Sequence, residues 1–151
     1  MLFRSTAIAT GCAEPLVDGN DGLIVACGTL LGAALEAARQ LRDEGLEVGV
    51  VNARFVKPLD TRLLLERIEA APWVVTVEEN ALPTGFGSAV LEAVNDARLS
   101  CGPIVRLGLP DRFVEHGERG ELLADLGLDA AGIAKACRSL AGAGRSKVPC
   151  T

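Results

Sequence analysis

The chain has 151 residues, a net charge of −5 and an estimated isoelectric point of 4.9. A chain of this length forms one domain and buries about 68–70% of the surface that its unfolded form exposes. Hydrophobic residues make up 49% of the sequence and aromatic residues only 3%, so we expect a core of Leu, Val, Ile and Ala, as in helices packed on a sheet. The acidic balance and the lack of a basic stripe argue against nucleic-acid binding.

The five cysteines and the single histidine argue against a structural metal site. The cysteines stand far apart and form no Cys-x-x-Cys pair; they are Cys12, Cys27, Cys101, Cys137 and Cys150. An odd number without zinc-ligand spacing indicates reduced thiols, and we therefore predict a cytoplasmic location. No apolar stretch approaches the roughly 20 residues that span a bilayer, and residues 1–13 lack the apolar segment of a secretory signal, so we predict no membrane partner.

Four short apolar runs alternate with helical patterns along the chain. The runs cover residues 23–27, 48–51, 73–77 and 104–107. The first three are nearly uninterrupted Val, Ile, Leu and Ala, the pattern of strands that are buried on both faces. Arg106 interrupts the fourth run, which predicts a strand with one face near solvent or a partner.

Helical periodicity follows each apolar run. We expect helices that begin after Thr29, after Asp60 and after Ser88, a short helix over about 118–126, and a last helix after Asp129. Thr and Asp are good N-caps, because a side-chain oxygen there accepts a hydrogen bond from a free backbone N–H group.

Strands that alternate with helices predict an α/β fold. We expect a three-layer sandwich with a mainly parallel open sheet. One domain should cover residues 15–141, preceded by a linker or disordered segment over 1–14 and followed by a flexible tail over 142–151.

In such a sheet, ligands and partners collect at the carboxyl ends of the strands. These ends carry unusual residues, which we treat as candidates for an interface or the rim of a site: Lys57, Glu78, Glu79, Asn80, Phe86, Asp111, Arg112, Phe113 and His116. Because loops are polar in most proteins, the pattern alone leaves a functional edge and a merely solvated edge equally open.

Three features of this edge have both a chemical and a structural interpretation. Gly85 and Gly87 before a helix could cradle a phosphate, although two glycines more often mark a tight turn with close helix packing. Glu78 and Glu79 could act as acid and base, but successive strand residues point to opposite faces and cannot share one substrate. His116 could carry a proton, but no nucleophile motif accompanies it.

Arg54 is the most informative of the charged residues. It comes two positions after Asn52, at the end of a buried strand, and Pro58 rigidifies the segment that follows. A guanidinium held there offers a planar fork to a phosphate or a carboxylate. An ion pair with Asp60 or Glu78 is the structural alternative, and the residues alone leave both open.

Several segments carry a family resemblance. They are residues 51–60 (Val-Asn-Ala-Arg-Phe-Val-Lys-Pro-Leu-Asp), 74–80 (Val-Val-Thr-Val-Glu-Glu-Asn), 85–90 (Gly-Phe-Gly-Ser-Ala-Val), 107–117 (Leu-Gly-Leu-Pro-Asp-Arg-Phe-Val-Glu-His-Gly) and 126–133 (Leu-Gly-Leu-Asp-Ala-Ala-Gly-Ile). In order and spacing they resemble the C-terminal, transketolase-type domain of 1-deoxy-D-xylulose-5-phosphate synthases. The likeness runs almost without gaps over about 22–140.

That family condenses pyruvate with glyceraldehyde 3-phosphate, releases CO2 and opens non-mevalonate isoprenoid synthesis, using thiamine diphosphate and magnesium. The resemblance implies three domains per subunit, a homodimer, and cofactor contacts confined to the first two domains. It gives the third domain contacts between domains and subunits. Through Arg54, it also implies a hold on the phosphate of the aldehyde substrate.

The sequence departs from the family by what it lacks. It contains no Gly-Asp-Gly followed by an Asn, the usual metal–diphosphate motif. We therefore expect no cofactor and no catalytic residue in this chain, inactivity alone, and a need for the thiamine-binding domains, whether from the same polypeptide or from another chain.

Two alternatives come from other classes of protein. A stand-alone binding or assembly module, or the small subunit of a split thiamine-dependent enzyme, would keep the fold and use its loop edge. An independent nucleotide-binding protein would need a glycine fingerprint that the chain lacks. Separated from other domains, the chain would expose apolar residues, which we expect around Leu82, Phe86 and Phe113, and would form a homo-oligomer.

Overall fold

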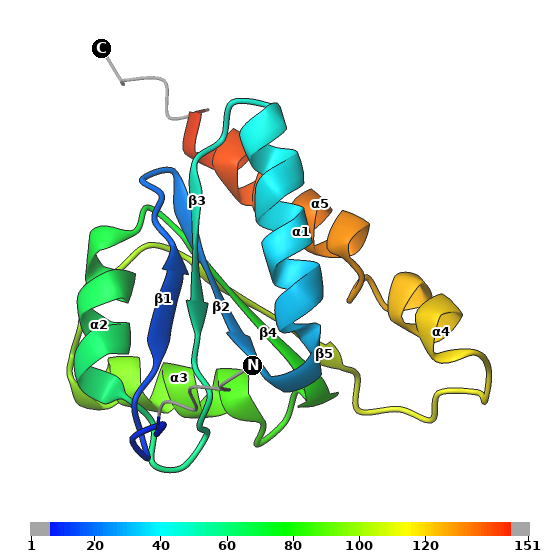
Figure 1. Ribbon diagram of the computed structural model, residues 1–151, viewed down its shortest axis with the longest axis horizontal. Helices are drawn as coiled ribbons and strands as arrows, with labels where there is room; N and C mark the ends of the chain where they lie inside the picture. The colour runs from blue at the N-terminus through cyan, green and yellow to red at the C-terminus, as the bar shows by residue number, and fades with distance from the viewer. Residues whose placement is uncertain (1–6, 146–151) are drawn as a thin grey trace, which may run out of the picture.

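The computed structural model describes residues 7–145, which form a five-stranded sheet between two layers of helices (Figure 1). The strands are β1 (Glu14–Val17), β2 (Gly22–Cys27), β3 (Val48–Asn52), β4 (Val74–Ala81) and β5 (Ile104–Leu109). The helices are α1 (Leu31–Asp43), which follows a short 3-10 turn η1 (Gly28–Leu30), α2 (Thr61–Ala70), α3 (Phe86–Asp96), α4 (Arg119–Asp125) and α5 (Ala130–Arg145). The predicted three-layer α/β fold is confirmed.

The strand order is β1-β3-β2-β4-β5, and the four strands from β2 to β5 are parallel to their neighbours. β1 is antiparallel to β3 and places Glu14 beside Asn52. The sequence did not predict this strand, because it is four residues long, half-exposed, and interrupted by Pro15. Proline is tolerated at the edge of a sheet, where its missing N–H group leaves no ladder bond unmade.

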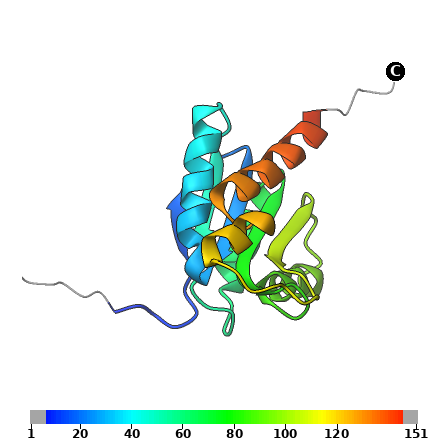
Figure 2. The same cartoon turned by 90° about the vertical axis from the view of Figure 1, so that its right-hand side faces the viewer.

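Alternating residues of the central strands build two separate cores. In β2, Ile24 and Ala26 face α1 and α5, whereas Leu23 and Val25 face α2 and α3. All four are at most 5% exposed, which explains why this strand reads as an unbroken apolar run. Figure 2 shows α1 and α5 packed side by side on their face of the sheet.

Side-chain caps fix two of the helix starts as predicted. Asp60 accepts the Leu63 N–H at 3.1 Å, and Asp129 accepts the Gly132 N–H at 2.7 Å. Asp60 also accepts the Ala13 N–H at 2.9 Å, which fastens the segment that leads into β1. The Thr29 cap is wrong: Thr29 lies in η1, and its hydroxyl donates to Glu79 instead.

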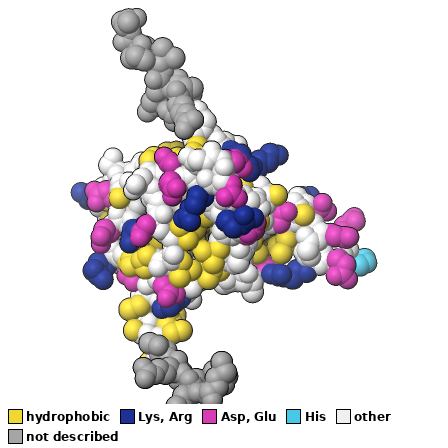
Figure 3. All heavy atoms as spheres, turned by 45° about the horizontal axis from the view of Figure 1, so that its top comes forward, with side chains coloured by type: hydrophobic (Ala, Val, Ile, Leu, Met, Phe, Trp, Pro, Cys, Tyr) yellow, Lys and Arg dark blue, Asp and Glu magenta, His cyan; other side chains and the backbone are white. Residues whose placement is uncertain are grey.

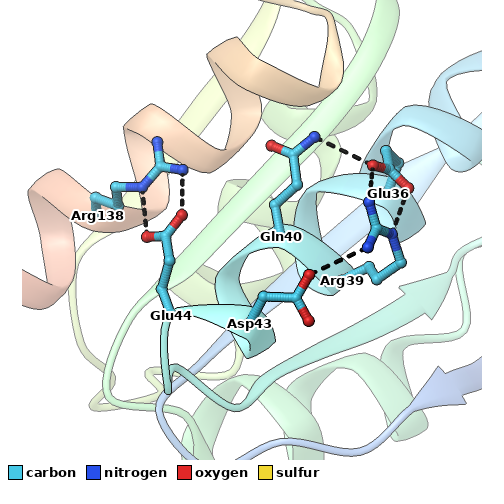
Figure 4. A network of polar contacts seen from close by, with 6 residues as sticks. All are labelled: Glu36, Arg39, Gln40, Asp43, Glu44 and Arg138. Atoms are coloured by element: carbon cyan, nitrogen blue, oxygen red, sulfur yellow. Dashed lines mark hydrogen bonds and ion pairs between the residues drawn. The ribbon is translucent and has the colours of Figure 1, made fainter.

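Charged side chains join α1 to α5 at the surface. Arg138 of α5 donates two hydrogen bonds, of 2.8 and 2.7 Å, to Glu44 just past the end of α1 (Figure 4). Within α1, Arg39 lies between Glu36 and Asp43 and bonds to both. These pairs are exposed, so they contribute little to folding, but the first one links segments that are 94 residues apart.

The ends of the chain differ in part from the predicted linker and tail. Residues 142–145 continue α5 as a helix, although Gly142 and Gly144 are poor helix formers. Residues 1–6 of the predicted linker and 146–151 of the predicted tail lie outside the described residues. Among residues 7–145, no helix is long and apolar enough to cross a membrane.

Candidate functional site at the carboxyl edge of the sheet

The four parallel strands end at one edge of the sheet, and the predicted candidates come from the ends of these strands and the segments that follow them. β4 is longer than expected and runs to Ala81, so Glu78, Glu79 and Asn80 belong to the strand rather than to the loop after it. The edge divides into two halves, because Glu78 points toward α3 and Glu79 points toward η1 and α4.

Glu78 is buried, with 2% of its surface exposed, and its carboxylate occupies the start of α3. It accepts the Phe86 N–H at 2.6 Å and the Gly87 N–H at 2.8 Å. A negative charge at a helix N-terminus satisfies free N–H groups and is favoured by the helix dipole. These bonds start the helix at Phe86, two residues before the Ser88 that the sequence indicated as its cap.

This arrangement decides between the two interpretations of Gly85 and Gly87. The N–H groups that could have cradled a phosphate already bind the Glu78 carboxylate. A Cβ atom at Gly85 would overlap Glu78 Oε2 and the Ala81 carbonyl oxygen, so glycine is required by close packing. The glycines therefore mark a tight turn.

Phe86 does not belong to the rim, and its prediction as an interface residue is wrong. It is 1% exposed and lies in the core on the α2–α3 face of the sheet. The reason is the Glu78 cap, which makes Phe86 the first residue of α3.

Glu79, the next residue, lies on the opposite side of β4. It accepts the hydroxyl of Thr29 and two N–H groups of Arg119, the Nε bond being 2.9 Å. Arg119, and to a lesser extent Thr29, lower the pKa of the Glu79 carboxyl. The prediction that Glu78 and Glu79 face opposite ways is confirmed, and the two carboxylates cannot act as an acid–base pair on one substrate.

Beyond Glu79 lies a surface projection that we call the α4 lobe, residues 110–126. Asp111, Arg112, Phe113 and His116 are all exposed on it. A pocket of about 360 Å³ lies between the lobe and the strand ends, lined by His116, Glu79, Arg119 and several leucines. A second pocket of about 320 Å³ is lined by Arg112 and Phe113. Among residues 7–145, no group of three or more His, Cys, Asp or Glu could hold a metal ion.

Arg54 lies at the other end of the edge, beside β1. Its backbone has a left-handed φ of 58°, and its N–H donates to Asn52 Oδ1 at 3.1 Å. The guanidinium forms an ion pair with Glu14, and the side chain is 25% exposed. Asp60 and Glu78, the partners considered from the sequence, are engaged elsewhere by backbone N–H groups.

The other candidates do not converge on a common point. Lys57 is exposed and lines a shallow groove between α2 and α3. Asn80 is exposed and accepts the N–H of Ala81. The structure therefore brings together Glu79 and the α4 lobe, and leaves Arg54, Lys57 and Glu78 in separate surroundings.

Sequence reasoning missed three residues of this edge. Glu14 was missed together with β1, and Thr29 was taken for a helix cap. Arg119 stands 40 residues from Glu79, and the sequence contains no signal for their pairing. Cys27, at the end of β2, was noted only as a cysteine; burial and the nearby Glu78 raise the pKa of its thiol.

The residues of this edge do not fit a metal–diphosphate group. The helix start that could have received an anion is filled by Glu78. Glu14 and Glu79 are bound to arginines, and Glu78 is bound to backbone N–H groups.

Known proteins resemble this chain in both sequence and structure. The family model for the transketolase C-terminal domain matches residues 11–133. 1-Deoxy-D-xylulose-5-phosphate synthase 1 of Geobacter sulfurreducens is 47% identical over 97% of this chain and 23% of its own length. The synthase of a Synechococcus strain is 51% identical over 85% of this chain and 20% of its own length. The chain thus spans about a fifth of the length of these curated relatives.

Two solved structures illustrate the structural likeness. A split-gene transketolase, described as an inactive β4 tetramer, has a TM-score of 0.83 and 34% identity, over 91% of this chain and 44% of its own. A transketolase from Pichia stipitis has a TM-score of 0.64 at 20% identity, over 91% of this chain and 19% of its own, and shows the fold alone. The chain belongs to the transketolase C-terminal domain family.

Proposed function

We propose that the chain is the C-terminal domain of a thiamine-diphosphate-dependent synthase, which condenses pyruvate with glyceraldehyde 3-phosphate to 1-deoxy-D-xylulose 5-phosphate. The observation that carries the proposal is the identity of 47% to a synthase of that name over 97% of this chain. The product of such an enzyme enters isoprenoid synthesis. We expect the enzyme to act in the cytoplasm.

The domain's part in this enzyme is to make contacts rather than to perform chemistry. Its buried carboxylate, Glu78, has both oxygens bonded to backbone N–H groups, and Glu79 is bonded to Arg119 and Thr29. Neither carboxylate is free to move a proton. The cofactor supplies the chemistry in thiamine-dependent enzymes, and it would be held by the domains that are not in this chain.

The test is a hybrid synthase, in which this chain replaces the matching residues of the Geobacter sulfurreducens synthase 1. We expect the hybrid to form 1-deoxy-D-xylulose 5-phosphate and the isolated chain to form none. Calorimetry should detect no binding of thiamine diphosphate with magnesium to the isolated chain. An inactive but folded hybrid, or micromolar cofactor binding by the isolated chain, would contradict the proposal.

Within that function, we propose that Arg54 binds the phosphate of glyceraldehyde 3-phosphate. The guanidinium is 25% exposed and pairs with Glu14, so a phosphate would have to compete with this carboxylate or use another edge of the fork. In the hybrid, Arg54→Ala should lower kcat/KM for the aldehyde roughly tenfold to a hundredfold, with KM for pyruvate little changed. Arg54→Lys should retain only part of the kcat/KM for the aldehyde, because an ammonium keeps the charge but lacks the planar fork.

Glu14→Gln is the matched control for Arg54. It breaks the ion pair but leaves the guanidinium free, so it should keep or lower the KM for glyceraldehyde 3-phosphate. If both variants instead lose thermal stability equally and neither changes the kinetics, Arg54 has only a structural role.

A second candidate is the small subunit of a split thiamine-dependent enzyme. The split-gene transketolase of similar fold supports it, since that protein is an inactive tetramer of β chains. The isolated chain should then also self-associate, and light scattering at increasing concentration would measure this. A strictly monomeric chain would argue against this candidate.

A further inference from the structure

The α4 lobe presents the most exposed large hydrophobic side chain that the structure describes. Phe113 is 89% exposed, whereas each of the other four exposed large hydrophobics is at most 61% exposed. Two pockets lie next to each other on the lobe and share Val114, Glu115, Leu122 and Leu126 in their linings. An exposed aromatic side chain beside apolar side chains, with charged residues around them, is the arrangement found at the centre of many protein–protein interfaces.

The lobe is also strongly acidic. It carries five acidic residues and two arginines, and Arg119 is already paired with Glu79. The acidic residues are Asp111, Glu115, Glu118, Glu121 and Asp125, and all are exposed. Figure 3 shows magenta carboxylates around the projecting end of the molecule, next to the single histidine and to hydrophobic side chains.

The inner side of the lobe is fixed to the rest of the fold. Leu123 and Leu126 pack against the core of the α1–α5 face, and Leu128, just beyond the lobe, is buried. The Arg119–Glu79 pair joins the start of α4 to the end of β4. The lobe therefore presents Phe113 from a fixed base.

We propose that the α4 lobe is a docking surface for a basic protein surface that offers an apolar pocket to Phe113. This proposal rests on the proposed function. The basic partner surface belongs to the cofactor-bearing part of the same enzyme, because this chain spans only about a fifth of the relatives' length. A second copy of the lobe fits poorly, because two acidic surfaces repel each other. Opposite charges at the rim steer the partner, and the apolar centre supplies most of the affinity.

Two variants of the hybrid synthase test this proposal, with one matched control. Phe113→Ser removes the anchor, and Glu115→Lys reverses a charge beside both pockets. Leu91→Ser removes an exposed apolar side chain of α3, on the other layer of the molecule, and serves as the control. Since Phe113 is 89% exposed, its variant should leave the melting temperature of the isolated chain unchanged.

The main measurement is limited proteolysis of the junction before this domain. Phe113→Ser should speed cleavage about tenfold or more, as expected when an interface loses its central aromatic residue. Glu115→Lys should speed it less and reduce its dependence on salt, and Leu91→Ser should match the parent hybrid. Equal cleavage of the Phe113→Ser and parent hybrids overturns the proposal, as does a parent junction that is cleaved like a free linker.

The outcomes separate this inference from the proposed function. An inactive hybrid in which Phe113→Ser still speeds cleavage leaves the docking surface in place and removes the assigned reaction. An active hybrid whose junction is cleaved at the same rate with and without Phe113→Ser supports the assigned reaction and removes the docking surface. Dimerisation of the isolated chain that Phe113→Ser abolishes would show that the partner is a second copy, against the basic surface proposed.

Discussion

Glu78 and Glu79 are neighbours in the chain, yet they belong to two differently built halves of the carboxyl edge. On the α3 side, Glu78 is 2% exposed and receives two backbone N–H groups. On the α4 side, the Glu79 side chain is 28% exposed and receives an arginine and a hydroxyl from segments far apart in sequence. A glutamate therefore caps a helix of the core in one half and binds a surface lobe in the other.

The two halves of the edge also differ in how much space they leave for a ligand or a partner. The Glu78 half is closed, because the Glu78 carboxylate packs against Gly85 at the start of α3 and leaves no space for a ligand. The Glu79 half is open, with a pocket of about 360 Å³ and an exposed aromatic side chain. We therefore expect substitutions in the first half to reduce folding stability, and substitutions in the second half to affect association.

The largest effect should come from Glu78→Ala. The change leaves the N–H groups of Phe86 and Gly87 buried without an acceptor. Hydrogen bonds to a charged group contribute about 1.5–3 kcal/mol each, so we expect the free energy of unfolding to fall by about 3 kcal/mol. Urea unfolding would measure it. Glu79→Ala is the control. Equal losses of unfolding free energy in the two variants would contradict the view that Glu78 contributes more to folding than Glu79 does.

Gly85→Ala should have the next largest effect. The added Cβ would overlap Glu78 Oε2 and the Ala81 carbonyl oxygen, so the helix start must shift, at a cost of about 1–3 kcal/mol. Gly32→Ala in α1 is the matched control, since a Cβ there meets no atom within 4 Å. That substitution should stabilise the chain by about 0.4–1 kcal/mol. Thermal unfolding of the pair measures both, and the same sign of change for both would refute this account.

Glu79→Gln should have a smaller effect that depends on pH. The folded state lowers the pKa of Glu79 below its ordinary value of 4.5, so ionised Glu79 favours folding above that pH. This contribution is lost as the pH falls through the lowered pKa. The variant should therefore be less stable than the parent at pH 7, by less than about 1 kcal/mol, and the difference should vanish in acid. A difference that is constant from pH 7 to pH 3 would exclude the ion pair as its cause.

The sequence predicted the parallel core of the fold because local patterns determine it. The apolar run of β2 and the caps Asp60 and Asp129 each depend on residues a few positions apart. β1 was missed because an edge strand of four residues with a proline has no such pattern.

The site was predicted less well, because its contacts link distant residues. The opposite orientation of Glu78 and Glu79 follows from strand geometry and was correct. The partners of Arg54, Thr29 and Glu79 were not found, since each pair is separated by 40 or 50 residues. Phe86 was misplaced because the carboxylate that starts its helix comes from another element.

The smallest effect should come from the charged pairs of Figure 4, which lie on α1 and α5, on the face of the sheet opposite α2 and α3. Arg138→Gln removes the bonds between α5 and Glu44, whereas Arg39→Gln removes bonds that remain within α1. Both sites are exposed, so each variant should lower the melting temperature by no more than about 2 °C, and about 1 M salt should abolish the loss.

The two variants should still differ in how often α5 opens. Cys137 of α5 is buried, and burial raises the pKa of its thiol to about 12, so it reacts only when the helix opens. Arg138→Gln should speed thiol labelling of Cys137 roughly two- to fivefold, and Arg39→Gln should not, because only the first pair joins α5 to α1. Mass spectrometry of the labelled peptide distinguishes Cys137 from the other cysteines. Equal labelling rates in the two variants would mean that the Glu44–Arg138 pair does not hold α5 in place.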